Sequence, residues 1–268
     1  MAFVLRVDLE SQKGISQGLP LLLDLLAKHK LKASFYLTMG GESNIFELLR
    51  YRGNVPNAGE RSLKVFTFLE KLRMALLPRD FVKHNLAVLK RIISEGHELG
   101  IHGWKHRRWT RGLEKIDVEN ELKLAIDKYV LMFGRQPDSF CSPAFRTNQN
   151  VVDSLDTNKI RIVSDYFGDK PSKIKNTKII NVPVTIKGEA NTPIIENKVT
   201  AGFSDDEIFD YLVSEVKKKE LSVMYLHGMY ECIEKINLLD RLFNYLNKSK
   251  TNVKTIGQVA NEDIANNK

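Results

Sequence analysis

Cysteine is scarce in this chain, which has only Cys141 and Cys232 among its 268 residues. Two cysteines cannot form the disulfide framework of a small secreted protein. The first ten residues, MAFVLRVDLE, contain five apolar residues before Arg6, so they lack the apolar segment of a signal peptide. Both observations predict a protein of the reducing cytoplasm.

Long apolar runs are absent as well. The most apolar stretch, residues 19–27, is interrupted by Pro20 and Asp24 and is far shorter than the roughly 20 residues of a membrane-spanning helix. The sequence therefore predicts no transmembrane segment. Apolar residues make up 43% of the chain and charged residues 28%, which is typical of a folded protein and excludes a mainly disordered one.

Acidic residues are outnumbered, with 33 against 41 basic residues and a net charge of +8. Such a balance favours anionic partners, which include nucleic acids, phosphorylated substrates and acidic membrane surfaces. The positive charge is dispersed, however, and no helix-turn-helix, zinc-finger or RNA-recognition signature is present. Near the histidines, tight basic clustering is limited to Lys105, Arg107 and Arg108, which would serve a substrate phosphate equally well. We therefore expect no nucleic-acid partner.

Strand-like and helix-like segments alternate along the chain. The sequence predicts strands at residues 4–7, 33–39, 98–101, 139–142, 160–164, 179–184 and 223–226, and helices at 18–29, 81–94, 116–133, 205–217 and 236–247. This alternation predicts an α/β fold with a mostly parallel sheet, either open or closed into a barrel. No linker of domain-separating length interrupts it, so residues 1–268 are expected to form a single domain.

Residues 42–80 do not follow this rhythm and are expected to be an insertion after the second strand. A helical face in this segment carries Val65, Phe68 or Leu69, Leu72 and Leu76, with Phe66 nearby and with Lys64, Lys71, Arg73 and Arg79 around it. One interpretation is a helix that packs on the core. The other is a basic amphipathic helix that docks on an anionic membrane.

Two histidines and two carboxylates are the first candidates for chemistry. His102 and His106 follow a predicted strand, and imidazoles four residues apart on a helical turn can bind one metal ion, although this pattern alone is common. Asp8 and Glu10 lie two residues apart at another strand end, so in extended backbone both point to one side. One could ligate the metal while the other accepts a proton from water. The simpler alternative is a solvated strand end.

Three further candidates also stand at or just past strand ends: His227, Arg146 and Asp165. Each has a simpler explanation, respectively a buried core histidine, a surface cation and a helix N-cap. In parallel α/β folds, however, active sites assemble at the carboxyl ends of the strands. The coincidence of so many polar residues at strand ends favours a site.

The ordered segments VDLES, HELGIHGWKHRRW, FR, SDYFG and YLHGMYE resemble the motifs of the NodB-type polysaccharide deacetylases of carbohydrate esterase family 4. The resemblance extends from residue 5 to about residue 231. It is closest to the branch that acts on amino sugars carried by undecaprenyl or other polyisoprenyl phosphates. The resemblance implies an irregular (β/α) barrel.

Carried over position by position, the resemblance also implies roles for these residues. Asp8 would be the catalytic base and His227 the general acid, with Arg146 orienting Asp8 and Asp165 tuning or holding the imidazole. Glu10, His102 and His106 would be the ligands of a divalent metal, zinc in the first place, with manganese, cobalt or nickel also suited to such a site. The sequence departs from the family pattern at Glu10, where aspartate is usual, and at Ala144-Phe145, where close relatives often have Gly-Trp.

The function implied is metal-dependent N-deacylation, above all deacetylation, of an amino sugar linked to polyisoprenyl phosphate, in the modification of lipid A and the cell envelope. The alternatives are a deformylase of 4-formamido-arabinose-phosphoundecaprenol, a deacetylase of another intracellular N-acetylated sugar, and an inactive glycolipid-binding relative. Such a substrate implies a cytoplasmic protein peripheral to the anionic inner leaflet of the inner membrane. The sequence does not determine the sugar, the acyl group, the metal or the oligomeric state.

Overall fold

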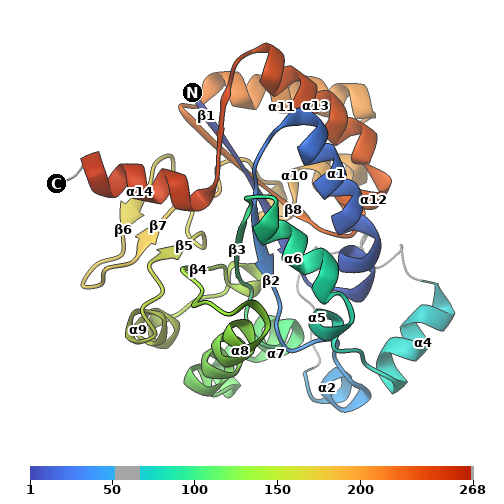
Figure 1. Cartoon of the computed structure of the whole chain (residues 1–268). Coiled ribbons are helices and arrows are strands. Elements are labelled where there is room, and N and C mark those ends of the chain that lie inside the picture. Colours follow the sequence, from blue (N-terminus) through green and yellow to red (C-terminus); the bar gives the residue numbers. More distant parts are fainter. Residues whose placement is uncertain (52–66, 267–268) are drawn as a thin grey trace.

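The computed structural model describes residues 1–51 and 67–266. Its centre is one curled sheet with the strand order β6-β7-β5-β4-β3-β2-β1-β8, and β9 also pairs with β1 (Figure 1). The strands are β1 (Ala2–Leu9), β2 (Ser34–Leu37), β3 (Glu98–Ile101), β4 (Ser139–Phe140), β5 (Ile162–Val163), β6 (Ser172–Lys173), β7 (Ile180–Asn181), β8 (Leu221–His227) and β9 (Asn252–Lys254). All of these pairings are parallel except β6 with β7. The α/β fold expected from the sequence is confirmed.

The two ends of the sheet are bridged by the segment that follows β7. Val184 forms a parallel bridge with Phe167, and Ile186 forms one with Met224 of β8. The backbone N–H groups of Thr185 and Ile186 both donate to the carbonyl of Val223. The sheet therefore curls into an irregular barrel, as the family resemblance implied.

Strand β1 separates two cores. Because successive side chains of a strand point to opposite faces, Phe3, Leu5, Val7 and Leu9 join the large core between the sheet and the outer helices. Val4 faces the other way, into a smaller core inside the curled sheet. Arg6 and Asp8 share the face of Val4, and the alternation thus directs two charged residues into the barrel interior.

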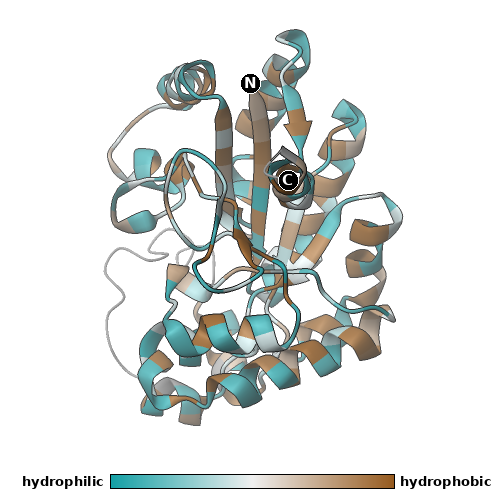
Figure 2. Cartoon of the chain, turned by 90° about the vertical axis from the view of Figure 1, so that its left-hand side faces the viewer, coloured by the Kyte–Doolittle hydropathy of each residue, from teal (hydrophilic) through white to brown (hydrophobic). Residues whose placement is uncertain are grey.

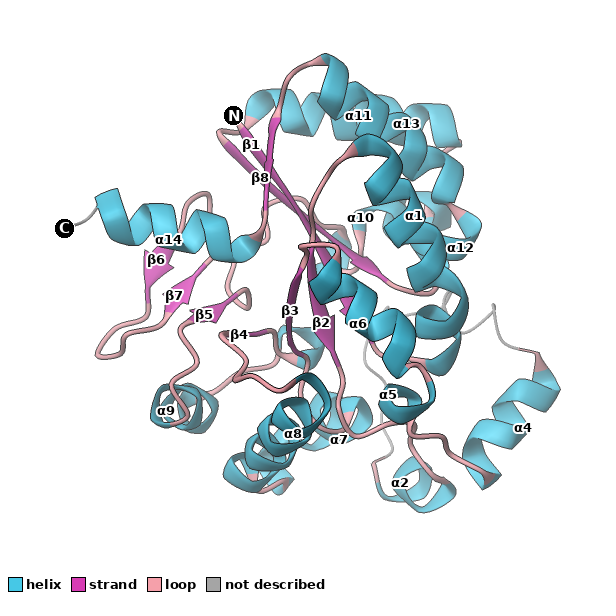
Figure 3. Cartoon of the chain, in the orientation of Figure 1, coloured by secondary structure: helices cyan, strands magenta, loops and turns pink. Residues whose placement is uncertain are grey.

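Helices surround the sheet on its outer face (Figure 3). They are η1 (Gly14–Gly18), α1 (Leu19–His29), α5 (Phe81–His84), α6 (Leu86–Ser94), η2 (Leu113–Lys115), α8 (Val118–Phe133), η3 (Pro143–Phe145), α9 (Gln149–Thr157), η4 (Glu189–Asn191), α10 (Ile194–Thr200), α11 (Asp205–Lys218), α12 (Tyr230–Glu234) and α13 (Ile236–Lys248). Helix α8 shows how the sequence sets their ends: Asp117 caps its first turn, and Gly134 ends it with φ 70°. The strands at the centre are mostly hydrophobic, whereas the helices carry both kinds of residue (Figure 2).

The last helix, α14 (Ile256–Asn266), closes the end of the barrel at which the strands begin. Its Ile256, Val259 and Ala260 belong to the inner core. The N–H of Ile256 donates to the hydroxyl of Ser34, and that of Gly257 donates to Glu98. Since Ser34 and Glu98 are the first residues of β2 and β3, the opposite end of the barrel is the one left for a site.

At that opposite end, helices α2 (Ile45–Arg50), α4 (Phe68–Leu76) and α7 (His106–Gly112) follow the strand ends. Helices α2 and α4 lie in the segment expected as an insertion, and each begins with a capping box, Asn44 with Glu47 and Thr67 with Glu70. The expected positions Lys64, Val65 and Phe66 lie outside the described residues. Among the helices described, none is long and apolar enough to cross a membrane.

Candidate active site

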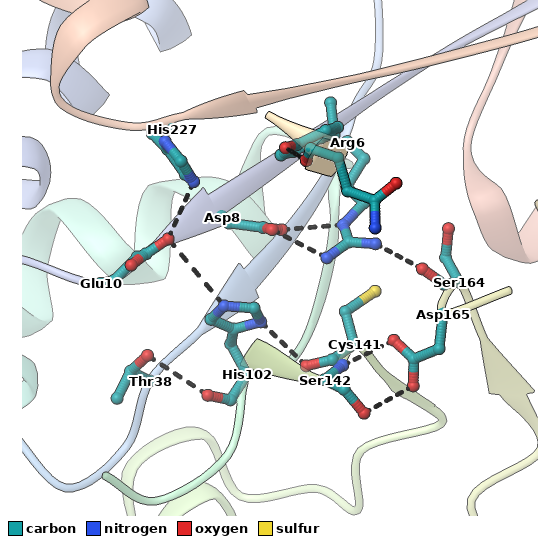
Figure 4. A network of polar contacts seen from close by, with 12 residues as sticks. Arg6, Asp8, Glu10, Thr38, His102, Cys141, Ser142, Ser164, Asp165 and His227 are labelled. Atoms are coloured by element: carbon teal, nitrogen blue, oxygen red, sulfur yellow. Dashed lines mark hydrogen bonds and ion pairs between the residues drawn. The ribbon is translucent and has the colours of Figure 1, made fainter. Parts of the chain in front are cut away.

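The carboxyl ends of β1, β3 and β8 bring polar side chains together (Figure 4). Strand β1 supplies Asp8 and, just beyond its end, Glu10, while His227 is the last residue of β8. The register places Asp8 directly beside His227 on the neighbouring strand. His102 follows the last residue of β3. The structure thus brings these four residues together at the carboxyl end of the sheet.

Glu10, His102 and His106 form a compact group of possible metal ligands. Their donor atoms all lie within 4.8 Å of one another. Nε2 of His106 is 2.8 Å from one carboxylate oxygen of Glu10, and Nε2 of His102 is 4.0 Å from the other. The two histidines do not share a helical turn, because His102 directly follows strand β3 and His106 begins α7. A turn at Gly103, with φ 72°, brings the two imidazoles together instead.

The hydrogen bonds of His102 show that this group suits a cation. Its Nδ1 is 2.8 Å from the carbonyl oxygen of Cys141, and because a carbonyl only accepts, Nδ1 must carry the proton. Burial lowers the pKa of His102 to about 4, so the ring is neutral near pH 7. Its Nε2 then directs a lone pair toward Glu10 and has no hydrogen-bond partner within the described part of the chain. Two imidazoles and a carboxylate, with a backbone carbonyl holding one of the rings, form a donor set that binds zinc and similar divalent metals.

His227 lies on the other side of Glu10, with its Nε2 3.2 Å from the carboxylate. Burial by itself would lower the pKa of His227, but Glu10, Glu196 and Glu231 raise it to about 10. Burial would conversely raise the pKa of Glu10, and His106 and His227 hold it well below its usual value. The imidazole of His227 is thus held as a cation that can donate a proton.

Two carboxylates near His227 were not singled out from the sequence. Glu196, in α10, has an oxygen 3.8 Å from Nδ1 of His227. Glu231, in α12, accepts a hydrogen bond from the backbone N–H of His227 at 3.1 Å, and burial raises its pKa to about 7. Glu231 is the last residue of the motif YLHGMYE, so its position in that motif could have identified it from the sequence. Glu196 follows Pro193 in a segment without a recognisable motif.

Arg6 holds Asp8 in a fixed orientation. Its Nε and Nη2 donate to the two carboxylate oxygens of Asp8 at 2.9 and 2.7 Å, and its Nη1 donates to the carbonyl of Ser164. Arg6 is fully buried. The rings of Phe145, Tyr36 and Tyr225 surround its guanidinium, with centroids 4.7, 5.6 and 5.6 Å away. Such a paired and surrounded arginine satisfies its donors without water.

The structure thus differs from the expectation that Arg146 orients Asp8. Arg146 donates to the carbonyl of Thr110 at 2.7 Å and pairs with Glu114 at the molecular surface. The cause is local backbone geometry: Ala144 and Phe145 both have positive φ, 54° and 56°. This turn brings the ring of Phe145 onto Arg6 and leaves Arg146 beside α7.

Asp165 also differs in its contacts from the expected role. Its two oxygens accept hydrogen bonds from the backbone N–H and the hydroxyl of Ser142, at 2.6 and 2.8 Å. Burial raises its pKa to about 6. Asp165 therefore fixes the turn after β4. The residue before Ser142 is Cys141, whose carbonyl accepts the hydrogen bond from His102. The influence of Asp165 on an imidazole is indirect and concerns His102, whereas Glu196 and Glu231 lie near His227.

Comparisons with known proteins agree with this geometry. Residues 8–163, more than half of the chain, match the model of the family described as polysaccharide deacetylase. Among curated proteins, a probable 4-deoxy-4-formamido-L-arabinose-phosphoundecaprenol deformylase of Shewanella sediminis is 31% identical over 130 residues, covering 46% of this chain and 42% of that protein. One of the same description from Wigglesworthia glossinidia brevipalpis is 25% identical over 154 residues, covering 54% and 53%. The chain spans about half the length of these relatives.

Solved structures share the fold. A probable polysaccharide deacetylase from Pseudomonas aeruginosa superposes with a TM-score of 0.70 at 14% identity, covering 97% of this chain and 89% of that one. A polysaccharide deacetylase from Mycobacterium smegmatis gives 0.67 at 13% identity, with 99% and 91% covered. The family match begins at Asp8 and includes His102 and His106. With the fold and the sequence match in agreement, the chain belongs to the polysaccharide deacetylase family.

Proposed function

We propose that this protein is a metal-dependent amidohydrolase that removes the N-acyl group, in the first place an acetyl group, from an amino sugar linked to a polyisoprenyl phosphate. The observation that carries the proposal is the group Glu10, His102 and His106, with Asp8 and His227 beside it on the neighbouring strands β1 and β8. Membership of the polysaccharide deacetylase family supports the reaction class. The two deformylases similar to this chain support a lipid-linked sugar.

Glu10, His102 and His106 would hold the metal. A divalent cation supplies, when bound, a Lewis acid that makes water more acidic and polarises an amide carbonyl. Zinc is the first candidate because two imidazoles and one carboxylate are a common zinc donor set. The hydrogen bond from Nδ1 of His102 to the carbonyl of Cys141 supports this assignment, since such a bond fixes the orientation of a ligating ring.

Asp8 would act as the general base. Both of its oxygens are engaged by Arg6, which fixes the plane of the carboxylate while each oxygen keeps a lone pair for a further proton. A base held in this way is oriented before the substrate arrives, so little reorganisation is needed during the reaction.

His227 would act as the general acid. Cleavage of an amide needs a proton on the leaving nitrogen, and a cationic imidazole can supply it. Glu196 and Glu231 lie beside the ring and the backbone of His227. The negative charge of Glu196, and that of Glu231 when it is ionised, favours the protonated imidazole before transfer.

A lipid-linked substrate would require the protein to work at the membrane surface. Each buried methylene of the lipid is worth about 0.8 kcal/mol, so the lipid stays in the bilayer and the enzyme must come to it. We place the protein at the cytoplasmic face of the inner membrane, with the net charge of +8 favouring anionic lipid. Helix α4 supports this placement, since Phe68, Leu69 and Leu76 are 77, 74 and 61% exposed. The exposure of these three side chains favours the docking helix over a helix packed on the core.

Deformylation is the second candidate, favoured by the description of the relative that is 31% identical. The test for both is to incubate the purified, metal-loaded protein with N-acetyl and N-formyl forms of polyisoprenyl-phosphate amino sugars, and to measure the released acid and the mass of the lipid product. Faster loss of acetyl supports the main proposal, and faster loss of formyl supports the second. Tight binding of both without release, equal in wild type and Asp8→Asn, would indicate an inactive glycolipid-binding protein.

A further inference from the structure

A basic cavity lies between the start of the first helical segment and helix α4. Its volume is about 360 Å³, and its lining includes Lys13, Arg73 and Arg79 together with Glu70 and Leu69. Three cations and one carboxylate give this lining an excess of positive charge. None of these residues belongs to the group around Glu10.

The three cations differ in their existing contacts. Arg73 is held by a bidentate pair with Glu42, at 2.7 and 2.9 Å. The ammonium group of Lys13 is 3.3 Å from Glu70. Arg79 is anchored through its backbone N–H, which donates to Glu42 at 2.8 Å, while its exposed guanidinium has no hydrogen bond or ion pair to any described residue. The cavity therefore has a fixed frame and an arginine whose side-chain donors no other residue of the described ranges 1–51 and 67–266 engages.

The position of the cavity relates it to the candidate active site. Lys13 follows Glu10 by three residues, which span at most about 11 Å of chain. The contact between Lys13 and Glu70 joins α4 to this segment. On the other side, Leu69 both lines the cavity and is 74% exposed, next to Phe68 at 77%. Figure 1 shows α4 projecting at this end of the molecule. The metal-ligand group, the basic cavity and the apolar helix thus follow one another in space.

We propose that this cavity binds the phosphate group that joins the amino sugar to its lipid, with the polyisoprenyl chain leaving along the exposed face of α4. The inference rests on the proposed function, because it assigns the amino sugar to the metal-ligand group, the phosphate to the basic cavity and the lipid chain to α4. Arginine presents planar, paired donors to phosphate oxygens, and Arg79 is placed to do so. The occupant is the substrate's own phosphodiester rather than the headgroups of surrounding phospholipids.

The test compares Arg79→Gln with Arg161→Gln. Arg161 is the matched control, because it is also an exposed arginine but lies just before β5, outside the cavity. Three substrates carry the same N-acyl sugar: a long-chain polyisoprenyl phosphate in neutral detergent, a short-chain water-soluble phosphate, and a phosphate-free alkyl glycoside. For Arg79→Gln we expect the ratio of kcat/KM on either phosphate to that on the glycoside to fall about tenfold, as for the loss of one charged hydrogen bond. Arg161→Gln should leave the ratio unchanged.

Two outcomes would overturn the inference. An equal loss on all three substrates would mean that Arg79 supports the fold or the chemistry. A loss confined to binding of anionic phospholipid vesicles, with the short-chain phosphate unaffected, would assign the cavity to headgroups. A further measurement separates this inference from the proposed function: calorimetry compares the binding of geranyl phosphate with that of geraniol. If the wild type turns over no substrate but binds geranyl phosphate more tightly than geraniol, and Arg79→Gln removes this difference, only the proposed function fails.

Discussion

Arg6 and Phe68 occupy environments opposite to those in which such side chains are usually found. Arg6 is fully buried inside the barrel, while Phe68 on α4 is 77% exposed. A buried charge is costly unless its partners satisfy it, and Asp8 and Ser164 do so within the chain. Exposed apolar side chains that gather on one helix are typical of a surface that binds a partner. The first region is therefore organised before any ligand binds, and for the second we propose a membrane surface as the partner.

The largest effect is expected from removing a metal ligand in the organised region. His102→Ala or His106→Ala should lower the metal content and reduce kcat by about 10³-fold or more, because a Lewis acid is worth several kcal/mol in such reactions. Elemental analysis and turnover measure the two effects. Chelation of the wild-type protein should have the same result, reversed by adding the metal back. Full activity after chelation would contradict the assignment.

Asp8→Asn should separate the base from the ligands. We expect kcat to fall by about 10²–10⁴-fold, the usual contribution of a general base, while the metal content stays near the wild-type value. Glu10→Gln is the matched comparison and should lose the metal. If Asp8→Asn emptied the site while Glu10→Gln left it filled, the roles of the two carboxylates would have to be exchanged.

Arg6→Lys tests whether orientation of Asp8 depends on the buried arginine. Lysine keeps the charge but cannot hold both carboxylate oxygens, so kcat should fall about 100-fold with little change in KM or in metal content. Arg146→Lys should have a much smaller effect, because Arg146 contacts Thr110 and Glu114 instead. A larger loss for Arg146→Lys, with both variants folded by circular dichroism, would restore the role implied by the family resemblance.

His97 provides a buried polar group at the opposite end of the strands, next to the start of β3. Burial lowers its pKa to about 4, below the value of 6.5 in the unfolded chain, so its contribution to stability is complete above pH 6.5 and is lost as the pH falls toward 4. Between pH 7 and pH 5 this amounts to about 2 kcal/mol. His97→Gln should reduce that pH dependence in urea unfolding. An unchanged slope would mean that other groups account for the acid sensitivity.

The smallest effect is expected on α4. Leu76→Ser should weaken binding to anionic vesicles up to about tenfold, since a fully buried leucine contributes roughly 1.5–3 kcal/mol and this one would be buried in part. Activity on a long-chain lipid should fall with it, whereas a short-chain analogue is spared. The control is Leu131→Ser, because Leu131 lies on α8 and is also a largely exposed leucine, with 74% exposure. Equal changes in both variants would show that α4 is not the docking surface.

Periodicity in the sequence was sufficient for the framework of the fold. The predicted strand at 98–101 coincides with β3, and the helices predicted at 205–217 and 236–247 end one residue before α11 and α13 do. Short elements without strong periodicity, among them α9, α10 and α14, were not predicted. Such segments take their conformation from tertiary packing, which a local pattern does not record.

The candidate site was predictable where motifs end strands, as with Glu10, His102 and His227. It was not predictable where a partner comes from a distant segment. Arg6 could have been noticed as a charge within an otherwise apolar strand, because such a residue must find a buried partner. Its partner is Asp8, two residues further along the same face of β1, whereas the carbonyl of Ser164, which also accepts from Arg6, comes from a distant segment that the sequence pattern does not reveal.

The pairing of β1 has a consequence for synthesis on the ribosome. Its neighbours are β2, β8 and β9, and the last two are formed by residues 221–227 and 252–254. The emerging chain therefore carries Asp8 and Glu10 on a strand with only one available neighbour until most of the protein has been made. Contacts between such distant segments slow folding, and an unpaired apolar strand is prone to associate with other chains. Asp8 and Glu10 are thus translated before the strands β8 and β9, whose pairing completes their surroundings.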